Sequence, residues 1–128
     1  MPARGKPPAT KRALMSWLST ASREIEIPQR RLSVLVANSV VLAALQRDLD
    51  ARGPRFLLKG GTGIEFRLGL RARASADLDT LFRGEFQHWL ESLDRALVEP
   101  FPPFTFSRSE PELIEVSTRV VKPYRVRI

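Results

Sequence analysis

The chain has 128 residues, of which 43% are hydrophobic, which is enough for one domain with a packed core. It contains no cysteine, which excludes disulfides, zinc–thiolate sites and cysteine nucleophiles. Its single histidine, His88, excludes multi-histidine metal cages and argues against a histidine-based triad. The formal net charge of +7 favours a polyanionic partner, either a nucleotide, a nucleic acid or an acidic membrane surface, although a genome rich in arginine codons gives the same excess.

The N-terminal part is predicted to hold a tail and two helices. Residues 1–10 are rich in proline and basic side chains, which is typical of a flexible tail. Apolar residues three and four apart predict an amphipathic helix over 11–22, and Pro28 opens a longer helix that extends to about Ala51. Since apolar residues surround this second helix almost completely, we expect it to be buried. Its apolar stretch is shorter than the ~20 residues of a membrane span, and the N-terminus does not resemble a signal peptide. The sequence therefore predicts a soluble, cytoplasmic protein without a membrane partner.

The rest of the chain alternates between predicted strands and helices. Residues 62–70 suit a strand or a helix, but their place between two strands favours a helix that joins parallel or mixed neighbours. The remaining predicted elements are strands at 55–59, 76–82, 105–107, 113–121 and 124–128, a basic loop at 71–75 and an amphipathic helix between Gly84 and Pro100. This order predicts an α/β (α+β) domain over 11–128, with a mixed sheet flanked by helices. Because the chain stops within an apparent strand, we expect the domain to be the N-terminal part of a longer fold.

Gly60, Gly61 and Thr62 form the first candidate binding motif. Glycines between a strand and a helix let backbone N–H groups approach a phosphate closely, and the helix N-terminus adds partial positive charge. Thr62 is expected to cap the helix and to donate its hydroxyl to the phosphate. Taken alone, a glycine pair is more often an ordinary tight turn. The motif is not a Walker loop, because the later Gly-Lys-Ser/Thr is missing.

Asp77 and Asp79 form the second candidate motif. Residues two apart on a strand point to the same face, so both carboxylates are expected to converge while Leu78, Thr80 and Phe82 face the core. Neighbouring carboxylates repel each other unless a cation lies between them, and magnesium prefers such hard oxygen ligands. Taken alone, such a pair is better explained as two solvated acids at a strand end. The order of strand, glycine turn, helix and paired acids is more specific than either motif.

The stretch from Leu58 to Thr62, followed by that from Arg73 to Asp79, closely resembles the AbiEii/AbiGii toxin family of nucleotidyltransferases, including the MenT-like toxins, within the polymerase-beta-like nucleotidyltransferase superfamily. The specific part of the resemblance covers residues 57–82, and the general layout covers 25–128. The resemblance implies a nucleotidyltransferase-type sheet with helices against it, a nucleoside triphosphate (NTP) substrate with Mg²⁺, and transfer of a nucleotidyl group, in some members to the 3′ end of tRNA. It also implies a type IV toxin–antitoxin pair with a separate antitoxin protein.

The resemblance also assigns roles to single residues. It implies that Gly60, Gly61 and Thr62 hold the triphosphate. It implies that Asp77 and Asp79 bind the metal ions, with two Mg²⁺ expected when nucleotide is bound, and that they serve as the catalytic acids.

Three further residues match the family pattern, and two features depart from it. For Arg73 and Ser75 the resemblance implies contact with phosphate or bracing of the acidic strand, whereas Lys59 suits nucleotide binding and an ordinary strand edge equally. Gly63 replaces the usual alanine. The family also has a later lysine and a third carboxylate, which we expect beyond residue 128. Glu115 has the pattern of a strand carboxylate but comes too early, so we expect it to be a surface residue and the chain alone to lack part of the catalytic set.

Two other readings of the sequence remain open. Gly60-Gly61-Thr62-Gly63 satisfies the G-x-x-G of a KH domain, whose loop clamps a nucleic-acid backbone. Paired acids close by would repel that backbone, which counts against a KH-like module. The other alternative is a degenerate, non-catalytic remnant that serves in protein interaction.

Overall fold

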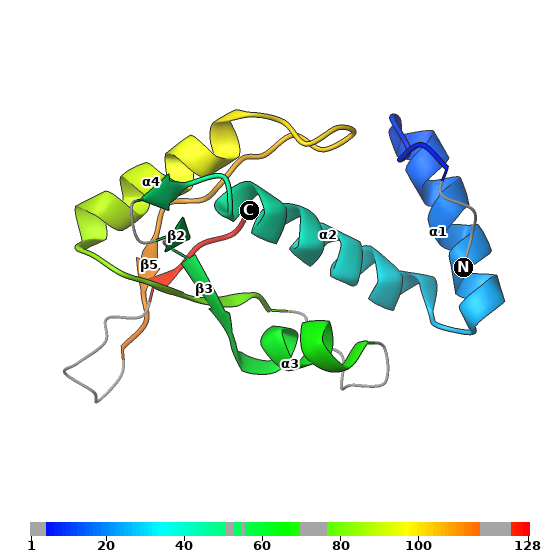
Figure 1. Cartoon of the computed structure of the whole chain (residues 1–128), viewed down its shortest axis with the longest axis horizontal. Coiled ribbons are helices and arrows are strands. Elements are labelled where there is room, and N and C mark those ends of the chain that lie inside the picture. Colours follow the sequence, from blue (N-terminus) through cyan, green and yellow to red (C-terminus); the bar gives the residue numbers. More distant parts are fainter. Residues whose placement is uncertain (1–4, 51–52, 55, 70–76, 116–123) are drawn as a thin grey trace.

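The computed structural model describes residues 5–50, 53–54, 56–69, 77–115 and 124–128, and the fold is taken from these (Figure 1). Its helices are α1 (Lys11–Ile25), α2 (Gln29–Leu45), α3 (Gly60–Leu68) and α4 (Phe86–Val98). Its strands are β1 (Leu49–Asp50), β2 (Gly53–Pro54), β3 (Phe56–Lys59), β4 (Asp79–Phe82), β5 (Glu112–Leu113) and β6 (Tyr124–Arg125). Helices combined with short strands confirm the predicted α/β (α+β) class. Within these described ranges, no helix combines the length and the apolar character required to cross a membrane.

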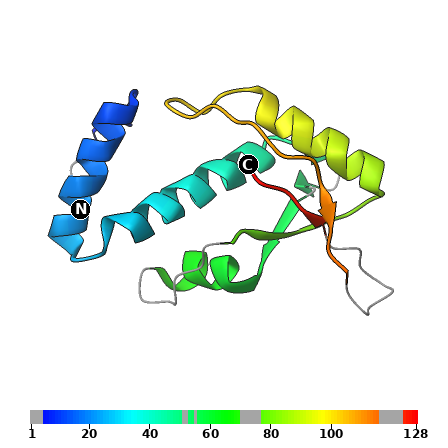
Figure 2. The same ribbon diagram turned by 180° about the vertical axis from the view of Figure 1, so that it is seen from behind.

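Helix α1 confirms the first predicted helix and extends it by three residues. Thr10 caps its start, because the Thr10 hydroxyl accepts a hydrogen bond of 3.2 Å from the Ala13 N–H. Glu26 ends it in the left-handed conformation, at a φ of 55°. The helix packs against α2 and lies at one end of the molecule (Figures 1 and 2).

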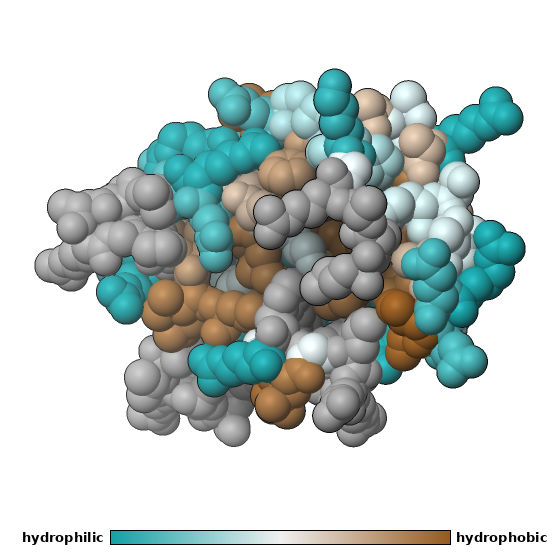
Figure 3. Space-filling model, turned by 45° about the vertical axis from the view of Figure 1, so that its right-hand side comes forward, coloured by the Kyte–Doolittle hydropathy of each residue, from teal (hydrophilic) through white to brown (hydrophobic). Residues whose placement is uncertain are grey.

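Helix α2 begins directly after Pro28, as predicted, but ends at Leu45 instead of extending to Ala51. The prediction of its end was wrong because Leu49–Asp50 pairs with Gly53–Pro54 as a short antiparallel ladder, which gives these backbone groups other partners. The predicted burial of α2 holds at Leu32, Val40, Ala44 and Leu45. Most of its other side chains are half-buried. On the face of the molecule shown in Figure 3, hydrophobic patches lie between hydrophilic residues.

The centre of the molecule is the unit β3–α3–β4. The choice of a helix after the first strand is confirmed by α3, which begins at Gly60, two residues earlier than predicted. The expected parallel or mixed neighbours were wrong, since β3 and β4 pair antiparallel, with Phe56 opposite Phe82 and Lys59 opposite Asp79. A nine-residue helix followed by a connection reverses the chain and returns it beside β3. The predicted loop 71–75 and the start of the second strand at Ala76 lie outside the described residues.

The hydrophobic core joins α2, β3 and α4. Its buried residues are Ala44, Leu45, Phe56, Leu93, Ala96 and Leu97. The spacing of the last three along α4 confirms the predicted amphipathic helix, with its apolar face inward. Phe82 of β4 extends this core, because its ring centroid lies 5.1 Å from that of Phe56. The core therefore covers one face of the β3–β4 ribbon.

The C-terminal part forms less strand than predicted. No strand covers 105–107, because the bridge between Phe101 and Phe104 closes a turn and the following residues form no ladder. The two later strands shrink to β5 and β6, which pair antiparallel, and 116–123 lie outside the described residues. Ser109 donates its N–H to the carbonyl of Arg127 at 2.8 Å, which holds the last residues beside this segment.

An ion pair fastens the C-terminal segment to α4. Nε and Nη2 of Arg108 donate to the two carboxylate oxygens of Asp94 at 2.5 and 3.0 Å. These hydrogen bonds lower the pKa of Asp94 below its usual 3.8, while the slight burial of its carboxyl opposes them. Because the pKa of the folded state is the lower one, the pair stabilises the fold above pH 3.8, and this contribution is lost as the pH falls through the folded value.

We therefore expect Asp94→Asn to lower the melting temperature slightly at neutral pH. The effect is small because the Asp94 side chain is 53% exposed. Thermal denaturation followed by circular dichroism from pH 7 to pH 2 is the measurement. The difference between wild type and variant should shrink once the pH falls below about 4. A difference that stays constant down to pH 2 would contradict an ionic origin.

Candidate nucleotide-binding site

The glycine turn follows β3 directly. Lys59 is the last residue of the strand, and Gly60 then turns the chain into α3 with a φ of +73°. L-residues with a side chain rarely adopt this conformation, so a glycine is required here for backbone reasons alone. The turn places the first backbone N–H groups of α3, including those of Gly61 and Thr62, at the end of the sheet. This is the arrangement that suits close approach of a phosphate.

Asp79 lies against this turn. It is the first residue of β4 and pairs with Lys59 in the antiparallel register. A Cβ atom added to Gly60 would lie 2.5 Å from Oδ2 of Asp79, closer than real Cβ atoms approach, and 3.2 Å from the Asp79 Cβ. The absence of a side chain at Gly60 therefore leaves the space that the Asp79 carboxylate occupies. Gly60 and Asp79, 19 residues apart in sequence, therefore lie in contact.

The two aspartates lie on the same side of the chain. Asp77 and Asp79 are exposed, whereas Leu78 and Thr80 are half-buried, which is the alternation predicted for paired acids on one face. Asp77 occupies a bend just before β4 instead of lying within the strand. Both aspartate side chains are therefore open to solvent, and that of Asp79 also contacts the glycine turn.

The other residues singled out from the sequence have different outcomes. Lys59 is exposed beside Gly60 and faces Asp79 across the ladder. Arg73 and Ser75 lie outside the described residues. Thr62 was expected to cap α3, and this was wrong, because the helix begins at Gly60 and Thr62 lies within its first turn. Glu115 is exposed after β5, as expected of a surface residue.

The donor set suits magnesium bound together with a nucleotide. Among the described residues, no group of three histidine, cysteine, aspartate or glutamate side chains comes together, so a metal cage made by the protein alone is not seen in this part of the chain. Mg²⁺ commonly uses only one or two carboxylates and completes its octahedron with water and substrate phosphates. The exposed pair Asp77 and Asp79 fits this mode of binding.

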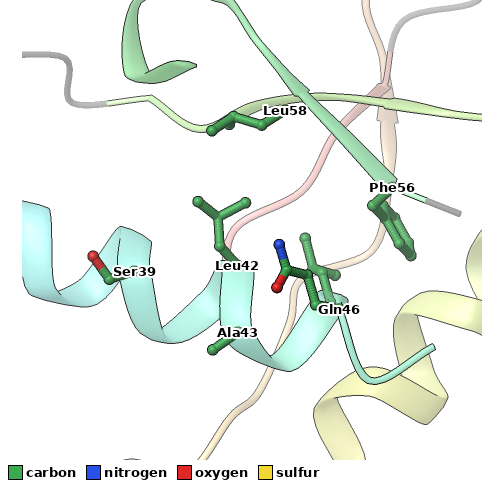
Figure 4. Close-up of a pocket in the computed structure, with 7 residues that line it drawn as sticks. Ser39, Leu42, Ala43, Gln46, Phe56 and Leu58 are labelled. Carbon is green, nitrogen blue, oxygen red and sulfur yellow. The ribbon is translucent and has the colours of Figure 1, made fainter. Parts of the chain in front are cut away.

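The opposite face of the ribbon carries a hollow of about 300 Å³ between α2 and β3 (Figure 4). It is lined by Ser39, Leu42, Ala43, Leu45, Gln46, Phe56 and Leu58. The lining is mainly apolar and contains no charged residue, so the hollow offers nothing to a triphosphate. The polar chemistry of β3 and β4 therefore lies on their other face.

Two further exposed residues follow the acids along the chain and were not singled out from the sequence. Leu81 is 41% exposed although it belongs to β4, and Arg83 is exposed directly after the strand. The signal that could have identified them is the continued alternation of residues 77–83, in which every odd position faces outward.

Comparison with known families identifies the unit that carries this site. The sequence model of the nucleotidyl transferase AbiEii toxin family, of type IV toxin–antitoxin systems, matches residues 43–113. This range is more than half of the chain and includes the glycine turn, both aspartates and α4. A search of curated proteins finds no significant match. The chain belongs to the AbiEii nucleotidyltransferase toxin family, as its resemblance in sequence implied.

Proposed function

We propose that this chain binds a nucleoside triphosphate with Mg²⁺ at Gly60 and Asp79 and serves to transfer a nucleotide to a hydroxyl group of RNA. The supporting observation is the contact between the two motifs, since a Cβ atom on Gly60 would lie 2.5 Å from the Asp79 carboxylate. A triphosphate held by the turn is thereby within reach of a cation held by the acids. Membership of a nucleotidyltransferase toxin family supports this reading over a KH-like module.

Each motif has a distinct task in the proposal. The backbone N–H groups of Gly60, Gly61 and Thr62 bind phosphate oxygens, and the exposed Lys59 adds positive charge beside them. Asp77 and Asp79 hold Mg²⁺, which supplies charge neutralisation for the phosphates and lowers the pKa of an attacking hydroxyl. Arg73 and Ser75 precede the acids and are proposed as further phosphate contacts.

The proposed reaction conserves atoms and charge. The acceptor hydroxyl oxygen forms a bond to the α-phosphorus of the nucleotide, and the bond from this phosphorus to the bridging oxygen of the β-phosphate breaks. Pyrophosphate leaves, and the hydroxyl proton passes to solvent. The protein contributes mainly by holding the phosphates in line and by compensating their charge.

Several wider features belong to the same proposal. The acceptor is RNA, which the net charge of +7 favours. A separate antitoxin protein is the expected partner, since the family belongs to type IV toxin–antitoxin systems. We further propose that residues 11–128 form one nucleotidyltransferase-like domain behind a basic tail of residues 1–10, and that the protein acts in the cytoplasm.

The proposal is tested by nucleotide binding and by transfer. The chain is incubated with each of the four α-³²P-labelled nucleotides, with Mg²⁺ or with EDTA, and binding is followed by filter retention. We expect retention with Mg²⁺ and its loss in EDTA, because the phosphates and the carboxylates repel each other without a cation. Addition of total RNA should move label onto RNA.

Binding and transfer are read separately, because nucleotide binding requires only the motifs described here. RNA binding that is indifferent to EDTA, with no nucleotide retained, would contradict the proposal and favour a KH-like module. Retention of nucleotide without transfer would keep the binding site and reject transfer by this chain alone.

A further inference from the structure

Helix α2 is more exposed than its sequence suits. Residues 32–46 contain no charged side chain, and apolar residues lie on nearly every side of this stretch. A helix of that kind is usually buried all round. Four of its residues are buried here, while most of its other apolar side chains are half-buried. The part of the chain that the structure describes therefore leaves apolar surface of α2 open.

This open surface continues into the hollow between α2 and β3. Four residues spaced four, three and four apart lie along one side of the helix, and the last three of them line the hollow: Leu35, Ser39, Leu42 and Gln46. Leu42 reaches toward Leu58 of β3 (Figure 4). A volume of about 300 Å³ holds about ten waters at ~30 Å³ each, and the mainly apolar lining offers them few hydrogen-bond partners. Apolar side chains that displace such water gain affinity.

Cations border this apolar surface. Residues 5–47, which include α1 and α2, contain seven lysines or arginines and two glutamates, hence a net charge of +5. Arg30 is exposed just before the uncharged stretch. Lys11 and Arg12 are exposed at the start of α1, which packs against α2. The complement of this surface is a partner that is apolar where it meets α2 and acidic around that contact.

We propose that α2, with the hollow beside it, is the docking site for an amphipathic helix of a partner protein, and that the polar face of this helix is acidic. Its apolar side chains pack on Leu35 and Leu42 and enter the hollow, and its carboxylates lie near the cations of α1 and of the start of α2. A helix bound in a groove uses apolar anchors three and four residues apart. None of these residues belongs to the proposed nucleotide site, so the inference does not rest on the proposed function.

Other occupants fit this surface less well. A nucleic acid needs cations along the surface that it follows, and residues 32–46 contain none. A lipid surface is flat and does not fill a hollow between a helix and a strand. A second copy of the chain brings the same excess of cations to the contact and is repelled by it.

The test measures binding of a fluorescein-labelled synthetic peptide to the full chain by fluorescence anisotropy. The peptide is a helix of about 15 residues, with leucines three and four apart and glutamates on its polar face. We expect a Kd of about 10 μM, as for a contact at the small end of specific interfaces. The same peptide with lysine in place of glutamate should bind at least about tenfold more weakly, because the cations of α1 and α2 repel it.

Two variants and two matched controls locate the contact. Leu42→Ser is expected to weaken binding of the glutamate peptide about tenfold, since it removes an apolar anchor from the hollow. Arg30→Glu should weaken it about fivefold and leave the core intact, because the side chain is exposed. Leu113→Ser, at a residue 58% exposed on β5, and Arg125→Glu on β6 should leave peptide binding unchanged.

Circular dichroism of each variant separates lost binding from lost folding. If Leu42→Ser does not fold, Arg30→Glu decides, and wild-type peptide affinity in that variant would overturn the inference. It would also be overturned by equal affinity for the two peptides, by equal losses in test and control variants, or by no binding of the glutamate peptide up to about 500 μM. Peptide binding without nucleotide binding would instead reject the proposed function and leave the docking site in place.

Discussion

Asp79→Asn is expected to lower Mg²⁺-dependent nucleotide transfer by the active protein about a thousandfold, and to abolish measurable nucleotide retention by this chain. The amide keeps the shape of the side chain, so the space beside Gly60 stays filled. It removes the negative charge that binds the cation. A bound metal stabilises the charge of the transition state by several kcal/mol, and each ~1.4 kcal/mol changes the rate tenfold. Asp77→Asn should act in the same direction, because both carboxylates lie on one side of the chain.

Glu115→Gln is the matched control for these variants. It removes one exposed carboxylate from the same chain, at a position after β5 that has no part in the proposed site. Isothermal titration with nucleotide and Mg²⁺, together with thermal denaturation of each variant, separates lost binding from lost folding. Unchanged titration curves for both aspartate variants would reject the metal-binding role. A loss in Glu115→Gln equal to that in Asp79→Asn would assign the effect to net charge.

Local signals in the sequence predicted those elements whose ends are set by neighbouring residues. The amphipathic patterns of α1 and α4 were sufficient because one face of each is apolar at helical spacing. Pro28 marked the start of α2 because proline fits the first turn of a helix and not its interior. The juxtaposition of Gly60 and Asp79 was predictable as well, from the order of strand, turn, helix and acids.

Elements decided by distant partners could not be predicted in this way. The end of α2 depends on the β1–β2 ladder, and the direction of β4 depends on its register with β3. Residues 105–107 have a strand-like pattern, but they follow the turn closed by Phe101 and Phe104 and pair with no other strand of the described chain. The capping role given to Thr62 failed for a related reason: the positive φ of Gly60 lets the helix begin at the glycine itself.

Gly60→Ala is expected to weaken nucleotide binding about a hundredfold and to destabilise the fold by about 1–2 kcal/mol. The stability loss follows from the φ of +73°, since an L-residue with a side chain is strained by that amount in the left-handed region. The binding loss has a separate cause. The new methyl group would lie 2.5 Å from Oδ2 of Asp79, so the carboxylate has to rotate out of its position beside the turn.

Two other glycines, Gly63 within α3 and Gly69 directly after it, separate these two causes. Gly69 has a φ of +70°, and a Cβ atom there meets nothing within 4 Å, so Gly69→Ala should cost about the same 1–2 kcal/mol and leave nucleotide binding unchanged. Gly63 lies within α3, and an added Cβ atom would make an ordinary contact of 3.6 Å with Leu58, so Gly63→Ala should stabilise the fold by about 0.5–1 kcal/mol.

Urea denaturation gives the three stabilities, and titration with nucleotide and Mg²⁺ gives the three affinities. If Gly60→Ala and Gly69→Ala lose the same stability and only the first loses affinity, the displaced Asp79 carboxylate is the cause, because backbone strain is common to both. Wild-type affinity in Gly60→Ala would show that binding of the triphosphate does not depend on the contact between Gly60 and the Asp79 carboxylate. The geometry that joins the two motifs would then have no role in binding.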